Sequence, residues 1–221
     1  MDSHKRLSIS PIGYAPSESG TYVVPFGGTA TLPVPLCPNC NRPFARFLGV
    51  PQSVSGLDRI IDLLCCWRCG LLTNVFSYRQ GTEQIEILCF GAGPEDESEP
   101  YHEFPDVLPV SSMRVAPLLN TPPGDLLFDE DWENHGLIRP AHQICGVPTV
   151  VVARIPICTE CKRESKFLAS VGDRAPDGIR LHGSSIVTLE YWYCRECNVV
   201  ILDTGPECGF IEDAQHPELN G

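Results

Sequence analysis

Apolar and polar residues alternate in two short segments of the chain, residues 83–90 and 185–193. The alternating apolar positions are Ile85, Ile87 and Cys89 in the first segment and Val187, Leu189, Tyr191 and Tyr193 in the second. A period of two predicts strands with one buried face. The β-branched run at residues 149–155 and the apolar run at residues 57–66 predict two further buried strands.

Prolines and glycines divide the chain into short elements. There are 21 prolines and 19 glycines, which favour short strands joined by turns. One short helix is predicted over residues 111–120, although Pro117 interrupts it. The predicted fold class is therefore mainly β, and α+β at most.

The same landmarks occur twice along the chain in the same order. The first set is Gly27-Gly28, Cys37-x2-Cys40, Phe47-Leu48 and Cys66-x2-Cys69. The second set is Cys145-Gly146, Cys158-x2-Cys161, Phe167-Leu168 and Cys194-x2-Cys197. Phe-Leu shifts by one residue relative to the preceding cysteines. The pattern predicts an internal duplication, with β-rich repeats over residues 1–92 and 141–221 packed together as zinc-ribbon-like modules.

The predicted connector, residues 93–140, contains two acidic stretches. Residues 93–109 combine acidic side chains with proline, which is typical of a solvated linker. A docking strip for a basic partner is the alternative interpretation. In residues 125–133 the acidic groups alternate with large apolar side chains, so this stretch is expected to pack against a domain.

The cysteine spacing predicts two metal sites. Each pair has two intervening residues, and 25 or 32 residues separate the two pairs of a quartet. One tight turn can aim both sulfurs of such a pair at a common point about 2.3 Å away. Four thiolates leave no open coordination position, so two structural Zn²⁺ ions are predicted. The predicted ligands are Cys37, Cys40, Cys66, Cys69, Cys158, Cys161, Cys194 and Cys197.

Three other uses of these cysteines fit the sequence less well. A redox pair is typical of a helix N-terminus in a βαβ unit, and disulfides require an oxidising compartment. An iron–sulfur cluster is chemically possible, but the spacings are closer to those of zinc ribbons. Gly70 and Asn198 follow the closing pairs, where a positive φ is easily tolerated.

Four cysteines lie outside the quartets. Cys65 is not chosen as a ligand because Tyr193 occupies its place in the second repeat. Cys89 and Cys145 are expected to be buried packing residues. A reactive thiol at Cys208 is left open.

Signatures of other chemistry are few. No P-loop, no GxGxxG and no GxSxG motif is present, and the six histidines lack metal-ligand spacing. His142-Gln143 is expected to be a hydrogen-bonded structural pair. A Cys–His nucleophile would need a proximity that the sequence does not reveal.

The formal net charge of −12 narrows the choice of partner. It repels phosphate backbones, which argues against nucleic acid, and it attracts basic proteins or peptides. No apolar run is long enough to span a membrane, and residues 1–10 do not resemble a secretion signal. The expected location is the cytoplasm, where thiols stay reduced.

These motifs resemble a known family. Gly27-Gly28 and Leu32-Pro33 followed by Cys37-x2-Cys40-x-Arg42-Pro43 resemble YwqG-like bacterial proteins and relatives of programmed cell death protein 2. Residues 142–148 and Trp192-x-Cys194 resemble their second half. The resemblance covers about residues 20–205, although Gly49 and Ala169 stand where relatives usually carry glutamine. It implies a duplicated β-rich fold, a chaperone of a basic ribosomal protein in eukaryotes, and toxin immunity in some bacterial members.

The leading hypothesis is a zinc-stabilised acidic protein that sequesters or escorts a partner protein, as a chaperone or as an immunity protein. The alternative is an enzyme with a non-metal active site in the cleft between the two halves.

Overall fold

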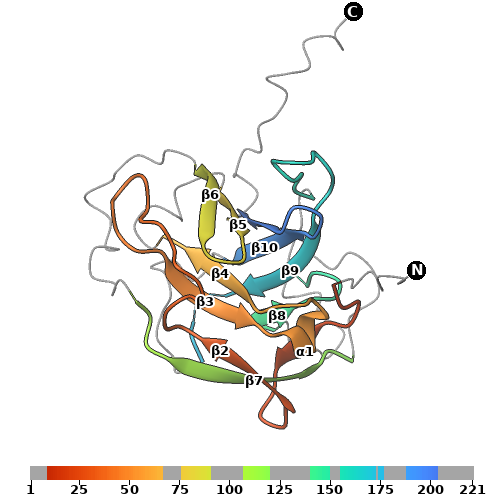
Figure 1. Cartoon of the computed structure of the whole chain (residues 1–221). Helices are drawn as coiled ribbons and strands as arrows, with labels where there is room; N and C mark the ends of the chain where they lie inside the picture. Colours follow the sequence, from red (N-terminus) through yellow and green to blue (C-terminus); the bar gives the residue numbers. More distant parts are fainter. Residues whose placement is uncertain are drawn as a thin grey trace, which may run out of the picture.

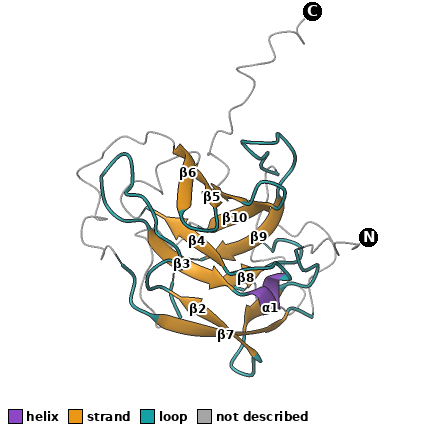
Figure 2. Ribbon diagram, viewed as in Figure 1, coloured by secondary structure: helices purple, strands orange, loops and turns teal. Residues whose placement is uncertain are grey.

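The described residues of the chain form one antiparallel β-sheet of eleven strands and almost no helix. Figures 1 and 2 show the arrangement of the strands. The strand order is β4-β3-β2-β7-β1-β8-β9-β10-β11-β5-β6. The computed structural model describes residues 9–66, 76–90, 107–119, 140–149, 155–172, 174–176 and 188–203. Within these ranges, no helical stretch has the length and apolar character that a membrane crossing requires.

The elements are short, as the frequent prolines and glycines predict. The strands are β1 (Tyr14–Pro16), β2 (Tyr22–Phe26), β3 (Ala45–Val50), β4 (Ile61–Cys65), β5 (Phe76–Gln80), β6 (Ile85–Phe90), β7 (Ser111–Pro117), β8 (His142–Ile144), β9 (Lys166–Val171), β10 (Leu189–Cys194) and β11 (Val199–Asp203). The one described helix, α1, spans Gln52–Ser55. The prediction of a mainly β protein is confirmed.

Three of the predicted strands are found where the apolar pattern placed them. They are β4 within residues 57–66, β6 within residues 83–90 and β10 at the end of residues 185–193. Most of the fourth predicted strand, residues 149–155, lies outside the described residues, as do both acidic stretches apart from residues 107–109.

The helix predicted over residues 111–120 is wrong, because Ser111–Pro117 forms strand β7. Exposed Ser112 and Arg114 alternate with buried Met113 and Val115, which is the pattern of a strand. Pro117 is the last residue of the strand, where the missing N–H costs little.

Two strands near the centre of the sheet connect the two halves of the chain. β1 comes before β2 in sequence, yet it pairs with β8, whereas β7 pairs with β2. β1 and β7 also pair with each other, so the sheet is continuous from one half to the other. These pairings cross the boundaries predicted for the repeats at residues 92 and 141.

Two hairpins, β3–β4 and β9–β10, have the same register. Both contain a bulge, which falls at Phe47 in β3 and at Leu168 in β9. The main-chain N–H of Gly27 bonds to Phe47 O at 3.0 Å, and that of Cys145 bonds to Leu168 O at 2.8 Å. Phe47 lies ten residues after Cys37, and Leu168 lies ten residues after Cys158. When the two hairpins are aligned on their bulges, Phe47 matches Leu168. This alignment needs no one-residue shift after the cysteines, whereas an alignment on the Phe-Leu pairs does.

The outer edge of β4 is paired by side chains instead of another strand. Gln80 accepts a hydrogen bond from Asp62 N (3.0 Å) and donates one to Ile60 O (2.7 Å). The Tyr78 hydroxyl accepts from Leu64 N (3.0 Å) and donates to Asp62 O (2.5 Å). The Tyr191 hydroxyl donates to Leu64 O at 3.3 Å.

These side chains allow β4 to be buried at the end of the sheet. A buried main-chain polar group without a partner costs free energy comparable to a lost hydrogen bond. Burial raises the pKa of Tyr78 and Tyr191 well above the usual range, so both hydroxyls keep the protons they donate. Because β4 packs against residues of β5 and β10, the sheet curls and encloses the main apolar core.

A buried ion pair supports the turn at Gly27-Gly28. Asp62 accepts from the N–H and the hydroxyl of Thr31, both at 2.6 Å, and from Arg46 at 3.3 Å. Arg46 Nε donates to Gly27 O at 2.8 Å. Each charge therefore has several hydrogen-bond partners, as burial of an ion pair requires.

We predict that Tyr78→Phe destabilises the protein by about 2–4 kcal/mol, because Leu64 N–H and Asp62 C=O lose their shared partner in the core. Tyr193→Phe is the matched control, because its hydroxyl donates to the part-exposed Asn198 side chain and not to the main chain of a buried strand. It should cost less than about 1.5 kcal/mol. Denaturant unfolding of the two variants measures the difference, and equal losses would argue against edge pairing by Tyr78.

A second prediction concerns the paired turn positions Gly27 (φ 69°) and Cys145 (φ 58°). Gly27→Ala should cost at least about 2 kcal/mol, because a Cβ there would collide with the carbonyl oxygen of Pro109. Cys145→Gly should change the unfolding free energy by less than about 1 kcal/mol, since relief of the left-handed backbone offsets the lost packing. Chemical denaturation compares the two, and tolerance of Gly27→Ala would contradict the crowding.

Candidate metal centres

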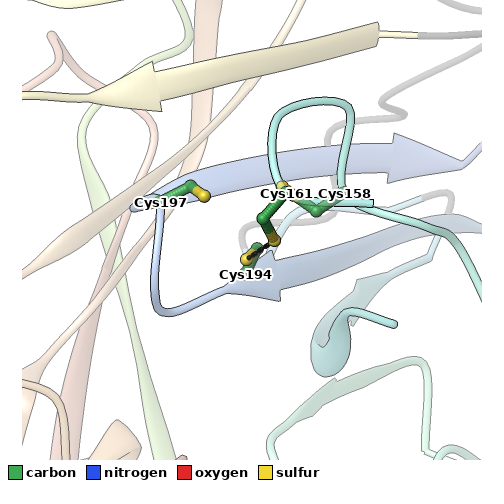
Figure 3. Close-up of side chains that lie close together, drawn as sticks. All are labelled: Cys158, Cys161, Cys194 and Cys197. Carbon is green, nitrogen blue, oxygen red and sulfur yellow. Dashed lines mark hydrogen bonds between the residues drawn. The ribbon is translucent and has the colours of Figure 1, made fainter. Parts of the chain in front are cut away.

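The second cysteine cluster brings together all four predicted ligands, Cys158, Cys161, Cys194 and Cys197 (Figure 3). Their sulfur atoms all lie within 4.8 Å of one another, and those of Cys161 and Cys194 are 3.5 Å apart. Cys194 ends β10, and Cys197 lies in the turn that leads to β11. Cys158 and Cys161 come from a tight turn closed by the bridge between Ile157 and Glu164.

The first cysteine cluster contains Cys37, Cys40 and Cys66. The sulfurs of Cys40 and Cys66 are 3.5 Å apart. The fourth predicted ligand, Cys69, lies outside the described residues. Cys65 is buried and donates its S–H to Cys66 O. The cluster contains Cys66 and not Cys65, which agrees with the choice of Cys66 as the ligand in the sequence.

The two turns that carry the first pair of each cluster share one backbone geometry. Cys37 N donates to Arg42 O and Asn41 N to Cys37 O, at 2.8 and 2.9 Å. In the second half, Cys158 N donates to Arg163 O and Lys162 N to Cys158 O, at 2.8 and 3.0 Å. These bonds fold each pair back on itself, so that both sulfurs point the same way.

A left-handed residue follows each described Cys-x2-Cys pair. These residues are Asn41 (φ 55°), Lys162 (φ 57°) and Asn198 (φ 54°). The sequence predicted a positive φ at Asn198 and at Gly70, which lies outside the described residues. Asn41 and Lys162 could have been predicted in the same way, because each directly follows the second cysteine of a Cys-x2-Cys pair. Lys162 has no local preference for this conformation, so the surrounding turn must impose it.

The sulfur distances fit a shared metal ion. Four sulfurs at about 2.3 Å from one Zn²⁺ are about 3.8 Å from each other, whereas a disulfide requires about 2.05 Å. All ten described cysteines are free thiols. Both clusters can therefore hold a metal ion, and four thiolates in the second cluster would fill a tetrahedral shell without an open position.

Hydrogen bonds and burial shift the cysteine pKa values in opposite directions. The Cys66 thiol, together with main-chain N–H groups of Cys40 and Asn39, lowers the pKa of Cys37 to about 5. The N–H of Arg163 lowers that of Cys161. Burial raises the pKa of Cys194 to about 12. In the first cluster, Cys37 with a pKa of about 5 offers an anionic ligand for a first contact with a cation.

The second cluster lies in its own small apolar environment. Cys158 and Cys194 pack with Phe167, Trp192 and Ile201, apart from the main core. The rings of Phe167 and Trp192 meet edge to face, with centroids 5.6 Å apart. Arg163 pairs with Glu196, which joins the two turns of the cluster across the surface. This exposed pair contributes little energy, and no sequence pattern indicated it.

Residues outside the clusters behave as structural groups. Gln143 bonds Cys145 O, Val147 O and Thr149 N, and His142 Nδ1 accepts from Gly172 N at 3.2 Å. Burial raises the pKa of the Cys145 thiol to about 12, and it also raises the pKa of the half-buried Cys89. Cys208 and the histidines other than His142 lie outside the described residues.

Comparison with known proteins gives no match: no family model, no curated protein and no solved structure is significantly similar to this chain.

We predict that the full chain binds two metal ions and that Cys194→Ser binds one. Serine is a poor ligand for this site, and binding to structural zinc sites is worth about 10–16 kcal/mol. Cys89→Ser is the control and should retain both ions, because Cys89 belongs to neither cluster. Elemental analysis of the purified proteins gives the stoichiometry.

Removal of the metal should unfold the β-sheet around the clusters, which far-UV circular dichroism and Trp fluorescence would report. Two retained ions in Cys194→Ser, or a lost ion in Cys89→Ser, would contradict the assignment.

Proposed function

We propose that this protein is a zinc-stabilised, acidic, cytoplasmic binding module that sequesters or escorts a basic partner protein. The observation that carries the proposal is the pair of cysteine clusters in a chain with a formal charge of −12. Closed thiolate sites build a scaffold instead of a reaction centre. Each tetrathiolate zinc site also adds about −2 to the charge of the protein.

Zinc is the proposed metal because four cysteine sulfurs within 4.8 Å of one another suit its preference for a tetrahedral shell of thiolates. In this proposal Cys69 completes the first site. The reducing cytoplasm keeps the thiolates available, and the free thiols of the described residues support that location.

We propose further that the two halves are copies of one zinc-ribbon-like module. The shared register and bulge of β3–β4 and β9–β10 support this, as do the matching hydrogen bonds at Cys37 and Cys158. The resemblance to YwqG-like proteins and to relatives of programmed cell death protein 2 is part of the same proposal. It suggests a chaperone-like or an immunity-like role, which differ in whether the partner is a client or a toxin.

The alternative, an enzyme with a site between the halves, has no support from the described residues. His142 is buried and its Nδ1 accepts a main-chain hydrogen bond. The Cys145 thiol is buried, and its raised pKa disfavours the nucleophilic thiolate. Neither group offers an accessible nucleophile.

We predict that the immobilised, metal-loaded chain captures a basic protein from its own cell extract at low salt. Capture should weaken strongly when the ionic strength rises from about 50 to about 500 mM, because salt screens the attraction between exposed charges. Mass spectrometry of the eluate identifies the partner. A heparin or DNA resin should not retain the chain at physiological salt, since its charge repels polyanions.

A fixed number of equivalents of one purified partner should then bind in isothermal titration calorimetry. The absence of any specific protein at low salt, or retention on DNA, would contradict the proposed function.

A further inference from the structure

Among the described residues, β6 is an edge strand with no further strand beside it. This strand pairs on one side with β5. On its other side, Ile85 N donates to Pro33 O at 2.9 Å. Main-chain groups that face the same edge recur every second residue, so the N–H and C=O of Ile87 also face outward. Among the described residues, no main-chain or side-chain group bonds to this pair of atoms.

The segment beside β6 leaves this edge unpaired because of its prolines. Pro33, Pro35 and Pro38 have no N–H, so residues 33–38 cannot form a regular ladder with β6. The segment makes the single bond at Ile85 and continues to the first cysteine cluster at Cys37. A groove of about 580 Å³ separates the two, with residues 33–36 and Pro38 on one side and residues 84–87 on the other.

The groove is mainly apolar, with acidic character. Leu36 is 49% exposed in its wall, and Ile85 and Ile87 form the opposite wall. Glu86 is the one charged residue among the described residues that line it. Its partner Arg79 also binds Glu160, so one positive charge is shared by two carboxylates. With a formal charge of −12 on the chain, this surface favours a cationic ligand.

We propose that this groove binds an extended segment of the partner protein, in which apolar residues alternate with Lys or Arg. The segment adds to β6 as an additional strand and exchanges two hydrogen bonds with the main chain of Ile87. Its apolar side chains contact Leu36 and Ile87, and its basic side chains lie near Glu86 and Glu160. This inference rests on the proposed function and specifies the recognition surface.

A second copy of this chain fits the edge less well. Pairing β6 with β6 would bring Glu86 of both copies to the same interface, where like charges repel. The prolines of residues 33–38 add no donors that would offset this repulsion. The charge therefore favours a basic segment over self-association.

The test uses the metal-loaded full chain and two synthetic ten-residue peptides, one alternating Val with Lys and the other Val with Glu. The lysine peptide should shift the ¹H–¹⁵N resonances of residues 84–88 and slow amide exchange at Ile87, which exchanges rapidly in the free chain. The glutamate peptide should cause no shifts. A protected Ile87 amide in the free chain, or shifts confined to other residues, would overturn the proposal.

Ile87→Pro gives the sharpest variant, because it removes an N–H that faces away from β5 and leaves the ladder with β5 intact. Affinity for the lysine peptide should fall at least about tenfold. Ile87→Val, the matched control, should bind within about twofold of the parent, since it keeps the N–H. Retention of both metal ions shows that each variant is folded. Equal binding by Ile87→Pro and the parent would refute strand addition.

A lysine peptide N-methylated at alternate residues tests the same bonds without altering the protein. One register of methylation should abolish binding and the other should not, because successive N–H groups of a strand face opposite edges. Sedimentation analysis tests whether a second copy of this chain occupies the β6 edge instead. A dimer of the free chain that Ile87→Pro dissociates would assign the edge to a second copy and overturn the proposal.

The outcomes separate this inference from the proposed function. If the parent and Ile87→Pro capture the same partner equally well, the module binds protein elsewhere and only the groove assignment fails. If the parent binds the lysine peptide but captures no protein, the groove stands and the proposed function fails.

Discussion

The structure depends on the side-chain hydrogen bonds that satisfy the buried edge strand β4. The N–H and C=O groups of β4 are buried, so they require partners. Tyr78, Gln80 and Tyr191 supply these partners from strands that are distant in the sheet order. To make these bonds the sheet must curl until β4 meets β5 and β10. The curl encloses the main core and leaves β6 as the edge that no described strand or side chain fully pairs.

The cysteine clusters connect turns and strand ends of the same sheet. In each half, a Cys-x2-Cys turn is stabilised locally by two main-chain hydrogen bonds. A third cysteine comes from the end of the hairpin, at Cys66 or Cys194. Coordination would therefore join a local turn to a strand that is distant in sequence. The first cluster also fixes one end of residues 33–38, which form a wall of the groove beside β6.

How much of this the sequence predicted depended on whether a feature was local. Alternation identified β6 and β10, a continuous apolar run identified β4, and paired spacing identified the cysteines that meet. Three-residue strands such as β1 and β8 are too short to produce a pattern. β7 was mistaken for a helix because two serines and Pro117 weakened its alternation. Pairing of β1 with β8, and of β4 with side chains of β5, is decided by contacts between distant residues, which local patterns do not contain.

The crossed placement of β1 and β7 has a consequence for how the protein matures during translation. While residues 1–100 emerge from the ribosome, the nascent N-terminal half has neither of the strands that flank β1, because β7 and β8 are still to be made. Apolar residues such as Val24 and Phe26 then stay accessible to chaperones until β7 arrives to pair with β2. Early capture of a metal ion by the first cysteines would hold a partial structure through this interval. The nascent chain therefore cannot complete its first half before much of its second half has been synthesised.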